Sequence, residues 1–373
     1  MAFDPNDLAP AGVKALHPYQ PGKPIDELAR ELGLDPGDIV KLASNENPLG
    51  PSPKALAAIR AELDELCRYP DGNGHDLKQA LAARLQVEPA QITLGNGSND
   101  VLELVVRGFV GADSEVIYSQ YAFAVYPIAT LAAGAKGVEV PAANWGHDLE
   151  AMAAAVTRRT RIIFIANPNN PTGTSVELKD IERFMTQVPD NVLVVLDEAY
   201  IEYLGNGFES LPGGGLSLLG QFPNLIVTRT FSKAWGLAAL RIGYAVSTPA
   251  VADILNRVRQ PFNVDSPALA AATAVLDDED YLVRSQVLNR QGLSQLEESI
   301  TALGLSFIPS SGNFLAVEVG PEAGAIYSQL LAKGVIVRPV GAYGMTHHLR
   351  VSVGLARENE RFLTALSEVL NAQ

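Results

Sequence analysis

Apolar residues recur along the middle of the chain in short uninterrupted runs, separated by longer stretches with helical spacing. Short, fully apolar runs of this kind are typical of strands buried in a parallel sheet with helices on both faces. The pattern therefore predicts an α/β fold built on a mostly parallel seven-stranded sheet. The seven runs are Ile92–Leu94, Val116–Tyr118, Gly137–Val140, Ile162–Ala166, Val192–Leu196, Leu225–Val227 and Ile242–Val246.

The pattern changes on both sides of this region. A Pro- and Gly-rich arm leads into a short helix near Ile25–Leu32, and amphipathic helices are predicted over Pro53–Leu66 and Asp76–Leu85. After Pro249, long helical stretches precede three short strands, which indicates a smaller α+β domain. We expect residues 1–44 to form an arm and part of the small domain, residues 45–265 the large domain, and residues 266–373 the small C-terminal domain. The late helices are Ala250–Arg259, Ala268–Leu276 and Asp280–Leu303, and the late strands are Asn313–Val319, Val335–Val340 and Leu349–Val353.

Composition narrows the class of protein. The 373 residues carry a net charge of −14, and no basic stripe is available to neutralise nucleic-acid phosphates. No run approaches the roughly 18 apolar residues of a membrane span, and the first seven residues lack the features of a signal peptide. A single cysteine, Cys67, can build neither a disulfide framework nor a thiolate metal site. These features predict a cytoplasmic globular enzyme without a metal, in which a few placed arginines bind any anionic substrate.

A lysine follows the sixth apolar run, at the edge where such sheets bind ligands. Lys233 comes shortly after Leu225–Val227, and a lysine held at a rigid strand end is partly desolvated, which makes it a usable amine nucleophile. Thr230, Ser232 and Arg241 could together bind one phosphate. The stretch therefore indicates a Schiff-base lysine beside a phosphorylated aldehyde, of which pyridoxal 5′-phosphate (PLP) is the usual one. Taken alone, a Ser-Lys pair is also compatible with a solvated loop.

Other strand ends carry groups that would complete such a site. Gly95–Asp100 opens a helix whose N-terminus can cradle a phosphate, although it lacks the spacing of a dinucleotide motif and the Walker lysine. Asn167–Gly173 is a stiff polar turn with an outward amide. Asp197 ends an apolar strand and is costly to bury unless it is paired, for example with a pyridinium N–H⁺. The aromatic residues of Tyr121–Tyr126 either stack on a flat ring or pack into the core.

These motifs resemble those of the fold type I PLP-dependent aminotransferases. The resemblance rests on Asn170-Pro171-Thr172-Gly173, on Asp197 and Tyr200 at their spacing, and on Ser232-Lys233 followed eight residues later by Arg241. Within that superfamily the chain is similar to the histidinol-phosphate aminotransferases along nearly its whole length. Further features of that family are Tyr19, Ser44-Asn45-Glu46-Asn47-Pro48, Arg68-Tyr69-Pro70, Asp197-Glu198-Ala199-Tyr200, Thr228-Arg229-Thr230-Phe231-Ser232-Lys233 and Leu349-Arg350-Val351-Ser352-Val353-Gly354.

The resemblance implies a role for each matching residue. Lys233 would hold PLP and move the proton, Asp197 would keep the ring nitrogen protonated, and Tyr200 would bind the ring hydroxyl. The remaining cofactor ligands would be Asn170 at the ring hydroxyl, Tyr126 stacked on the ring, and Ser98, Asn99, Thr230, Ser232 and Arg241 at the phosphate. Tyr69 would reach the cofactor phosphate of a partner subunit, which implies a homodimer with shared active sites. Arg350 would bind the substrate anion, with Arg338 and Tyr19 nearby.

The implied reaction is a ping-pong transfer of an amino group from L-histidinol phosphate to 2-oxoglutarate, yielding imidazole acetol phosphate and glutamate in histidine biosynthesis. Two segments depart from the family pattern: Gly341–His348 carries a tyrosine and two histidines, and Gln120–Phe123 replaces a more usual Pro-Thr-Tyr. Both could shift specificity toward aromatic amino acids. An aromatic aminotransferase and a PLP-dependent decarboxylase therefore remain as alternatives, and a non-catalytic PLP-binding domain is disfavoured by the complete set of Lys233, Asp197 and Arg350.

Overall fold

The computed structural model describes residues 3–204 and 213–372 of the chain. Its large domain is built on a seven-stranded sheet with the strand order β2-β8-β7-β6-β5-β3-β4. All neighbouring strands are parallel except β8, which runs antiparallel to both β2 and β7. The strands are β2 (Ile92–Asn96), β3 (Glu115–Ser119), β4 (Lys136–Val140), β5 (Thr160–Ala166), β6 (Leu193–Asp197), β7 (Leu225–Thr230) and β8 (Ile242–Val246). The α/β fold predicted from the seven apolar runs is confirmed.

The central strands are apolar on both faces because helices cover both. Ile163 and Val194 face one core, while their neighbours Ile162 and Val195 face the other. This alternation follows from the two-residue period of a strand. The first face is covered by α3 (Pro53–Glu62), α4 (His75–Leu85), α7 (Leu149–Ala154), α8 (Leu178–Met185) and α10 (Ser266–Leu276). The second face is covered by α5 (Ser98–Phe109), α6 (Val125–Ala132) and α9 (Pro249–Val258).

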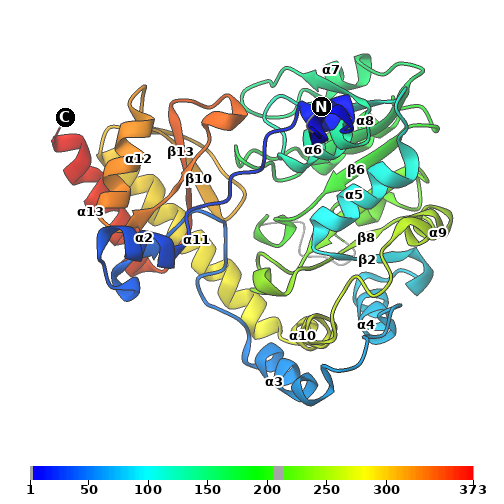
Figure 1. Ribbon diagram of the computed structural model, residues 1–373, viewed down its shortest axis with the longest axis horizontal. Coiled ribbons are helices and arrows are strands. Elements are labelled where there is room, and N and C mark those ends of the chain that lie inside the picture. The colour runs from blue at the N-terminus through cyan, green and yellow to red at the C-terminus, as the bar shows by residue number, and fades with distance from the viewer. Residues whose placement is uncertain (1–2, 205–212, 373) are drawn as a thin grey trace.

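The small domain contains a second, antiparallel sheet with the order β12-β13-β10-β9. Its helices pack on one side of this sheet, so that β10 and β13 lie nearer to the large domain (Figure 1). The strands are β9 (Ser306–Ile308), β10 (Phe314–Glu318), β12 (Arg338–Pro339) and β13 (His348–Ser352). The helices are α2 (Ile25–Leu32), α11 (Glu279–Ala302), α12 (Ala323–Ala332) and α13 (Ala356–Asn371), and a two-stranded pair joins β1 (Val40–Lys41) to β11 (Val335–Ile336).

Helix α11 connects the two domains (Figure 1). Near its start Leu282 belongs to the large-domain core, whereas Leu296 further along belongs to the small-domain core. Helix α10 also packs in the large-domain core. We therefore place the boundary within α11 rather than after residue 265. The pairing of β1 with β11 groups the segment around residue 40 with the small domain.

Short elements complete the chain. The N-terminal turn and helix α1 (Ala11–Lys14) lie beside α6 of the large domain (Figure 1). Across residues 3–204 and 213–372, every helix is too short or too polar to span a lipid bilayer. The 3₁₀ turns are η1 (Pro5–Asp7), η2 (Pro36–Asp38), η3 (Leu63–Glu65), η4 (Pro89–Gln91), η5 (Ile201–Tyr203), η6 (Gly214–Leu218), η7 (Ala238–Leu240) and η8 (Gly341–Tyr343).

Candidate active site

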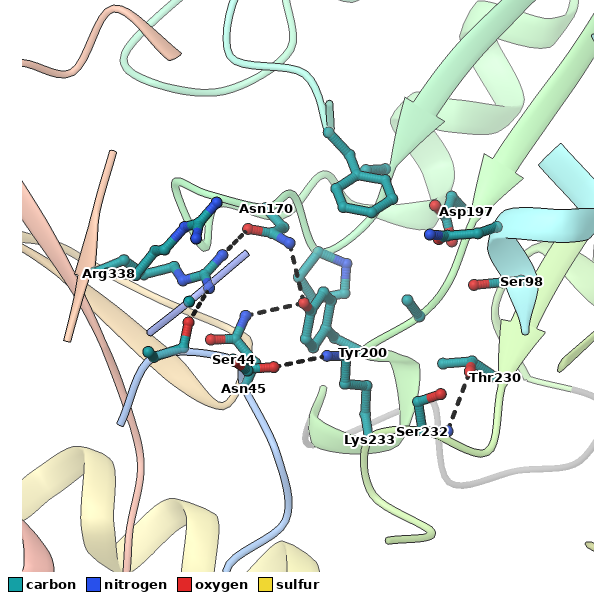
Figure 2. Close-up of a pocket in the computed structure, with 18 of the residues that line it drawn as sticks. Ser44, Asn45, Ser98, Asn170, Asp197, Tyr200, Thr230, Ser232, Lys233 and Arg338 are labelled. Carbon is teal, nitrogen blue, oxygen red and sulfur yellow. Dashed lines mark hydrogen bonds between the residues drawn. The ribbon is translucent and has the colours of Figure 1, made fainter. Parts of the chain in front are cut away.

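A pocket lies between the carboxyl ends of the large-domain strands and the small-domain sheet (Figure 2). This is the place where open α/β sheets bind ligands. The pocket gathers residues that the sequence places far apart. Of the candidate residues predicted from the sequence, those that line it are Tyr19, Ser98, Asn99, Asn170, Asp197, Tyr200, Thr230, Ser232, Lys233, Arg241, Arg338 and Arg350.

One end of the pocket is shaped to hold an anion. The first turn of α5 begins at Ser98, and a helix N-terminus offers free N–H groups and a positive dipole. Arg241 Nη1 lies 3.4 Å from Ser232 Oγ. At Gly97, which has φ +79°, an added Cβ would lie 2.5 Å from Arg241 Nη2, so any other residue would strain the backbone and displace the guanidinium. The cup therefore fits a phosphate group.

A buried carboxylate lies deeper in the pocket. Asp197 Oδ2 accepts a hydrogen bond from the Tyr126 hydroxyl at 2.8 Å, and Oδ1 accepts one from Thr228 Oγ1 at 3.1 Å. Burial raises the pKa of Asp197, and these two donors act in the opposite direction by stabilising the ionised form. A carboxylate held in this way fits a protonated pyridine nitrogen as its partner.

The structure corrects the role expected for Tyr126. Its side chain is only 1% exposed, stacks on Phe164 with 4.4 Å between ring centroids, and does not line the pocket. Phe123 lines the pocket instead. The reason is local, because α6 begins at Val125 and turns Tyr126 back toward the sheet, whereas Phe123 precedes the helix. Phe123 rather than Tyr126 therefore stands where a flat ring could stack, and Tyr126 is a donor to Asp197.

Lys233 lies beside Tyr200 at the centre of the pocket (Figure 2). Its Nζ donates to the Ser44 carbonyl at 3.2 Å and lies 5.5 Å from the centroid of the Tyr200 ring. Burial, followed by the positive charge of Arg350, lowers the pKa of Lys233 to about 7. A large fraction of the amine is therefore neutral and nucleophilic near neutral pH.

Two amides meet at the hydroxyl of Tyr200 (Figure 2). Asn45 Nδ2 and Asn170 Nδ2 donate to this oxygen at 3.0 and 3.2 Å. Burial raises the pKa of Tyr200 to about 12, so the hydroxyl keeps its proton and can donate it to a neighbouring oxygen. Sequence reasoning gave Asn45 no role of its own. Its place in the family motif Ser44-Asn45-Glu46-Asn47-Pro48 was the signal that could have found it.

Two arginines of the small domain form the opposite end of the pocket. Arg350 is 6% exposed, and its Nη1 and Nη2 donate to Asn170 Oδ1 at 2.6 Å and to the Ala43 carbonyl at 2.7 Å. Among the described residues its Nε has no partner. Arg338 is less enclosed; it donates to the Gln20 carbonyl and lies 5.3 Å from the centroid of the Tyr19 ring. The pair can accept an anionic group through guanidinium N–H donors.

Tyr69 does not join the pocket of its own chain. Its side chain is 82% exposed and stacks on Phe262, with 4.7 Å between the ring centroids.

The chain matches the family of class I and II aminotransferases over residues 37–366. It is 63% identical to a histidinol-phosphate aminotransferase 2 of Pseudomonas aeruginosa, over 97% of this chain and 98% of that protein. It is 54% identical to a histidinol-phosphate aminotransferase of Methylobacillus flagellatus, over 98% of both chains. Among solved structures, histidinol-phosphate aminotransferase from Sinorhizobium meliloti in complex with pyridoxal-5′-phosphate superposes with a TM-score of 0.87 at 33% identity, covering 97% of each chain.

Proposed function

The chain belongs to the class I and II aminotransferases and, within them, to the histidinol-phosphate aminotransferases, and we propose that it binds PLP and transfers the amino group of L-histidinol phosphate to 2-oxoglutarate. The products are imidazole acetol phosphate and glutamate, and the reaction serves histidine biosynthesis. The observation that carries this proposal is the position of Lys233. Its amine, with a pKa of about 7, stands in one pocket with the Asp197 carboxylate and the anion cup of Ser98 and Arg241.

The pocket matches PLP group by group. The cup at the start of α5 would hold the phosphate, Asp197 would pair with the ring nitrogen, and Tyr200 and Asn170 would bind the ring hydroxyl. Phe123 would cover one face of the ring. When bound, PLP supplies a ring that withdraws electrons from the substrate carbon that loses its proton.

The chain's own groups position the substrate and move the proton. Lys233 is a base of suitable strength because burial has lowered its pKa to about 7, so it would accept a proton from the substrate carbon and then donate it to the cofactor carbon that keeps the amino group. Asp197 keeps its hydrogen bonds from Tyr126 and Thr228 throughout, which holds the carboxylate in one orientation. Removing Lys233 would therefore abolish proton transfer and leave the anion cup in place.

Both substrates present an anion, and Arg350 is suited to each. A guanidinium pairs bidentately with either a carboxylate or a phosphate. Arg350 is buried and linked through Asn170 to the Tyr200 hydroxyl, which ties the substrate end of the pocket to its centre. Arg338, held near the arm by the Gln20 carbonyl, would adapt to the difference in length between the two substrates.

The proposed enzyme works as a homodimer. Tyr69 is exposed and lies outside its own pocket, so its hydroxyl is available to the cofactor phosphate of a partner subunit. A Tyr69→Phe variant should keep its fold and bind PLP more weakly, and light scattering should give the mass of two chains. A monomer with full activity would contradict this part of the proposal.

The test of the reaction is turnover of L-histidinol phosphate with 2-oxoglutarate by the purified protein. We expect glutamate to form, and Lys233→Ala to abolish turnover and to remove the absorbance band of PLP bonded to the lysine. The second candidate is an aromatic aminotransferase, favoured by the aromatic side chains of Tyr19, Phe123 and Tyr343 in the pocket lining. A kcat/KM higher for phenylalanine than for L-histidinol phosphate would select that alternative. Release of CO2 from an amino acid over many turnovers, without any 2-oxo acid, would instead indicate a decarboxylase.

A further inference from the structure

One face of strand β13 touches the large domain at two positions two residues apart. Side chains at such a spacing share a face of a strand. Arg350 reaches Asn170, as described above, and His348 meets Trp145 with 4.9 Å between ring centroids and an interplanar angle of 64°. The second contact is the edge-to-face geometry that aromatic rings prefer. The proposed reaction gives this second contact no role.

Trp145 stands at the tip of a strained hairpin. Asn144 and Trp145 have φ values of 48° and 66°, and Ala143 and Gly146 close the turn through a pair of backbone hydrogen bonds of 3.1 and 2.9 Å. A left-handed backbone is unfavourable for a bulky residue, and asparagine and glycine adopt it more readily. A tryptophan that keeps this conformation indicates that its ring is used.

The surroundings fix the hairpin to the large domain. The amide of Ala142 donates to Gln120 Oε1 at 3.2 Å, and Thr174 Oγ1 donates to the Trp145 carbonyl at 3.3 Å. The Trp145 ring also packs on Tyr121, with 5.0 Å between centroids. The ring is 36% exposed, whereas His348 is 5% exposed. Trp145 therefore belongs rigidly to the large domain and covers a histidine of the small one.

A second contact joins the same two domains. The amide of Ser311, from the loop between β9 and β10, donates to the Gly173 carbonyl at 2.8 Å, and its hydroxyl lies 2.9 Å from Ser175 Oγ. A Cβ added at Gly173 would lie 2.3 Å from Ser310 Oγ, so the loops are in close contact. The small domain is thus drawn against the large one, with Arg350 at hydrogen-bonding distance from Asn170.

We propose that Trp145 and His348 form a clasp that positions Arg350 for the anionic group of the substrate. His348 and Arg350 lie on one five-residue strand that pairs with β10 and β12 on its two sides, so the strand moves as a unit. Loss of the clasp lowers the fraction of molecules in which Arg350 meets Asn170, and apparent affinity falls with that fraction. The inference rests on the proposed function, because it takes Arg350 as the residue that binds the substrate anion.

The test uses Trp145→Asn in the PLP-loaded enzyme. Asparagine tolerates a left-handed backbone, so the relief of strain should offset part of the lost ring contacts and this variant should fold. We expect KM for both substrates to rise about two- to tenfold, because this is the change in affinity that corresponds to the loss of one aromatic pair. Both kcat and the PLP affinity should stay within about twofold of wild type. Trp145→Phe keeps an aromatic ring at this position, so its KM values should stay close to those of the wild type.

Two further variants separate a clasp from a general structural role. His348→Leu should raise KM as Trp145→Asn does, and the double variant should be no worse than either single one, because both remove the same contact. Phe307→Ala removes an aromatic ring that packs on the small-domain core away from the cleft, and it should lower Tm without changing KM. An unchanged KM in Trp145→Asn, or multiplicative effects in the double variant, would overturn the clasp. Absence of turnover in the wild type would instead refute the proposed function.

Discussion

The hydrogen bond from Tyr126 to Asp197 gives the sharpest test of the cofactor site. Tyr126→Phe removes only the hydroxyl that donates to Asp197 Oδ2 at 2.8 Å and leaves the ring stacked on Phe164. Burial already raises the pKa of Asp197, and loss of this donor raises it further. Because only the ionised carboxylate can pair with a protonated ring nitrogen, protonation of Asp197 competes with cofactor binding.

The size of the effect follows from the charge on the acceptor. A hydrogen bond to a charged group contributes about 1.5–3 kcal/mol, which corresponds to a loss of roughly ten- to hundredfold in PLP affinity where Asp197 is protonated in the apoprotein. The direction in which this loss of affinity changes with pH follows from the proton that Asp197 must release when PLP binds. Since the pKa of the carboxyl is raised, the loss should be greatest at low pH and should shrink as pH rises through that pKa.

The assay is titration of the apoprotein with PLP, followed by the cofactor's absorbance, from the most acidic pH at which the apoprotein stays folded up to mildly alkaline pH. The ratio of dissociation constants for variant and wild type should fall as pH rises. The matched control is Tyr118→Phe, a buried tyrosine of the same hydrophobic core, which should leave the ratio near one. A Tyr126→Phe affinity equal to wild type at the lowest pH, or a ratio independent of pH, would refute the reasoning.

Three further predictions concern the same pocket. The pKa of Lys233 is lowered to about 7 from its ordinary 10.5, so between these values only the unfolded chain binds that proton. The free energy of unfolding of the apoprotein should therefore increase as pH rises from 7 to 10. Urea denaturation of Lys233→Met should lack this increase, and a pH profile identical to that of wild type would contradict the prediction. Gly97→Ala places a methyl group 2.5 Å from Arg241 Nη2 and should weaken PLP binding at least tenfold in a titration. Tm of the apoprotein should also fall, because a φ of +79° is strained for alanine, and wild-type PLP affinity would argue against the anion cup. Arg350→Lys loses the bidentate fork and should raise KM for both substrates roughly ten- to hundredfold in steady-state kinetics, and a change for one substrate alone would mean that the other anion binds elsewhere.

The sequence was most informative about site residues that lie at the ends of strands. Asp197, Asn170 and Lys233 follow separate apolar runs, and a parallel sheet brings the carboxyl ends of its strands to one edge. Their convergence therefore needed no knowledge of side-chain packing. The apolar runs themselves do not encode direction, which is why the antiparallel course of β8 could not be read from Ile242–Val246.

The remaining features depend on geometry that a linear pattern does not contain. The exchange of Tyr126 for Phe123 turned on where α6 begins, and helix starts are uncertain by a few residues in a sequence. The contact of Trp145 with His348 joins residues about 200 positions apart that only the packing of the two domains brings together. His348 ends a stretch, Gly341–His348, that was predicted only to influence specificity, yet it is buried at the start of β13.

The most direct test of the account is a single half-reaction. PLP-loaded protein mixed with L-histidinol phosphate alone, with no 2-oxo acid present, should lose the visible absorbance of the cofactor and release one equivalent of imidazole acetol phosphate per site. Later addition of 2-oxoglutarate should restore the absorbance and release one equivalent of glutamate. Absorbance that L-histidinol phosphate leaves unchanged, or that 2-oxoglutarate does not restore, would contradict the assignment of this chain to the transfer of an amino group between these two substrates.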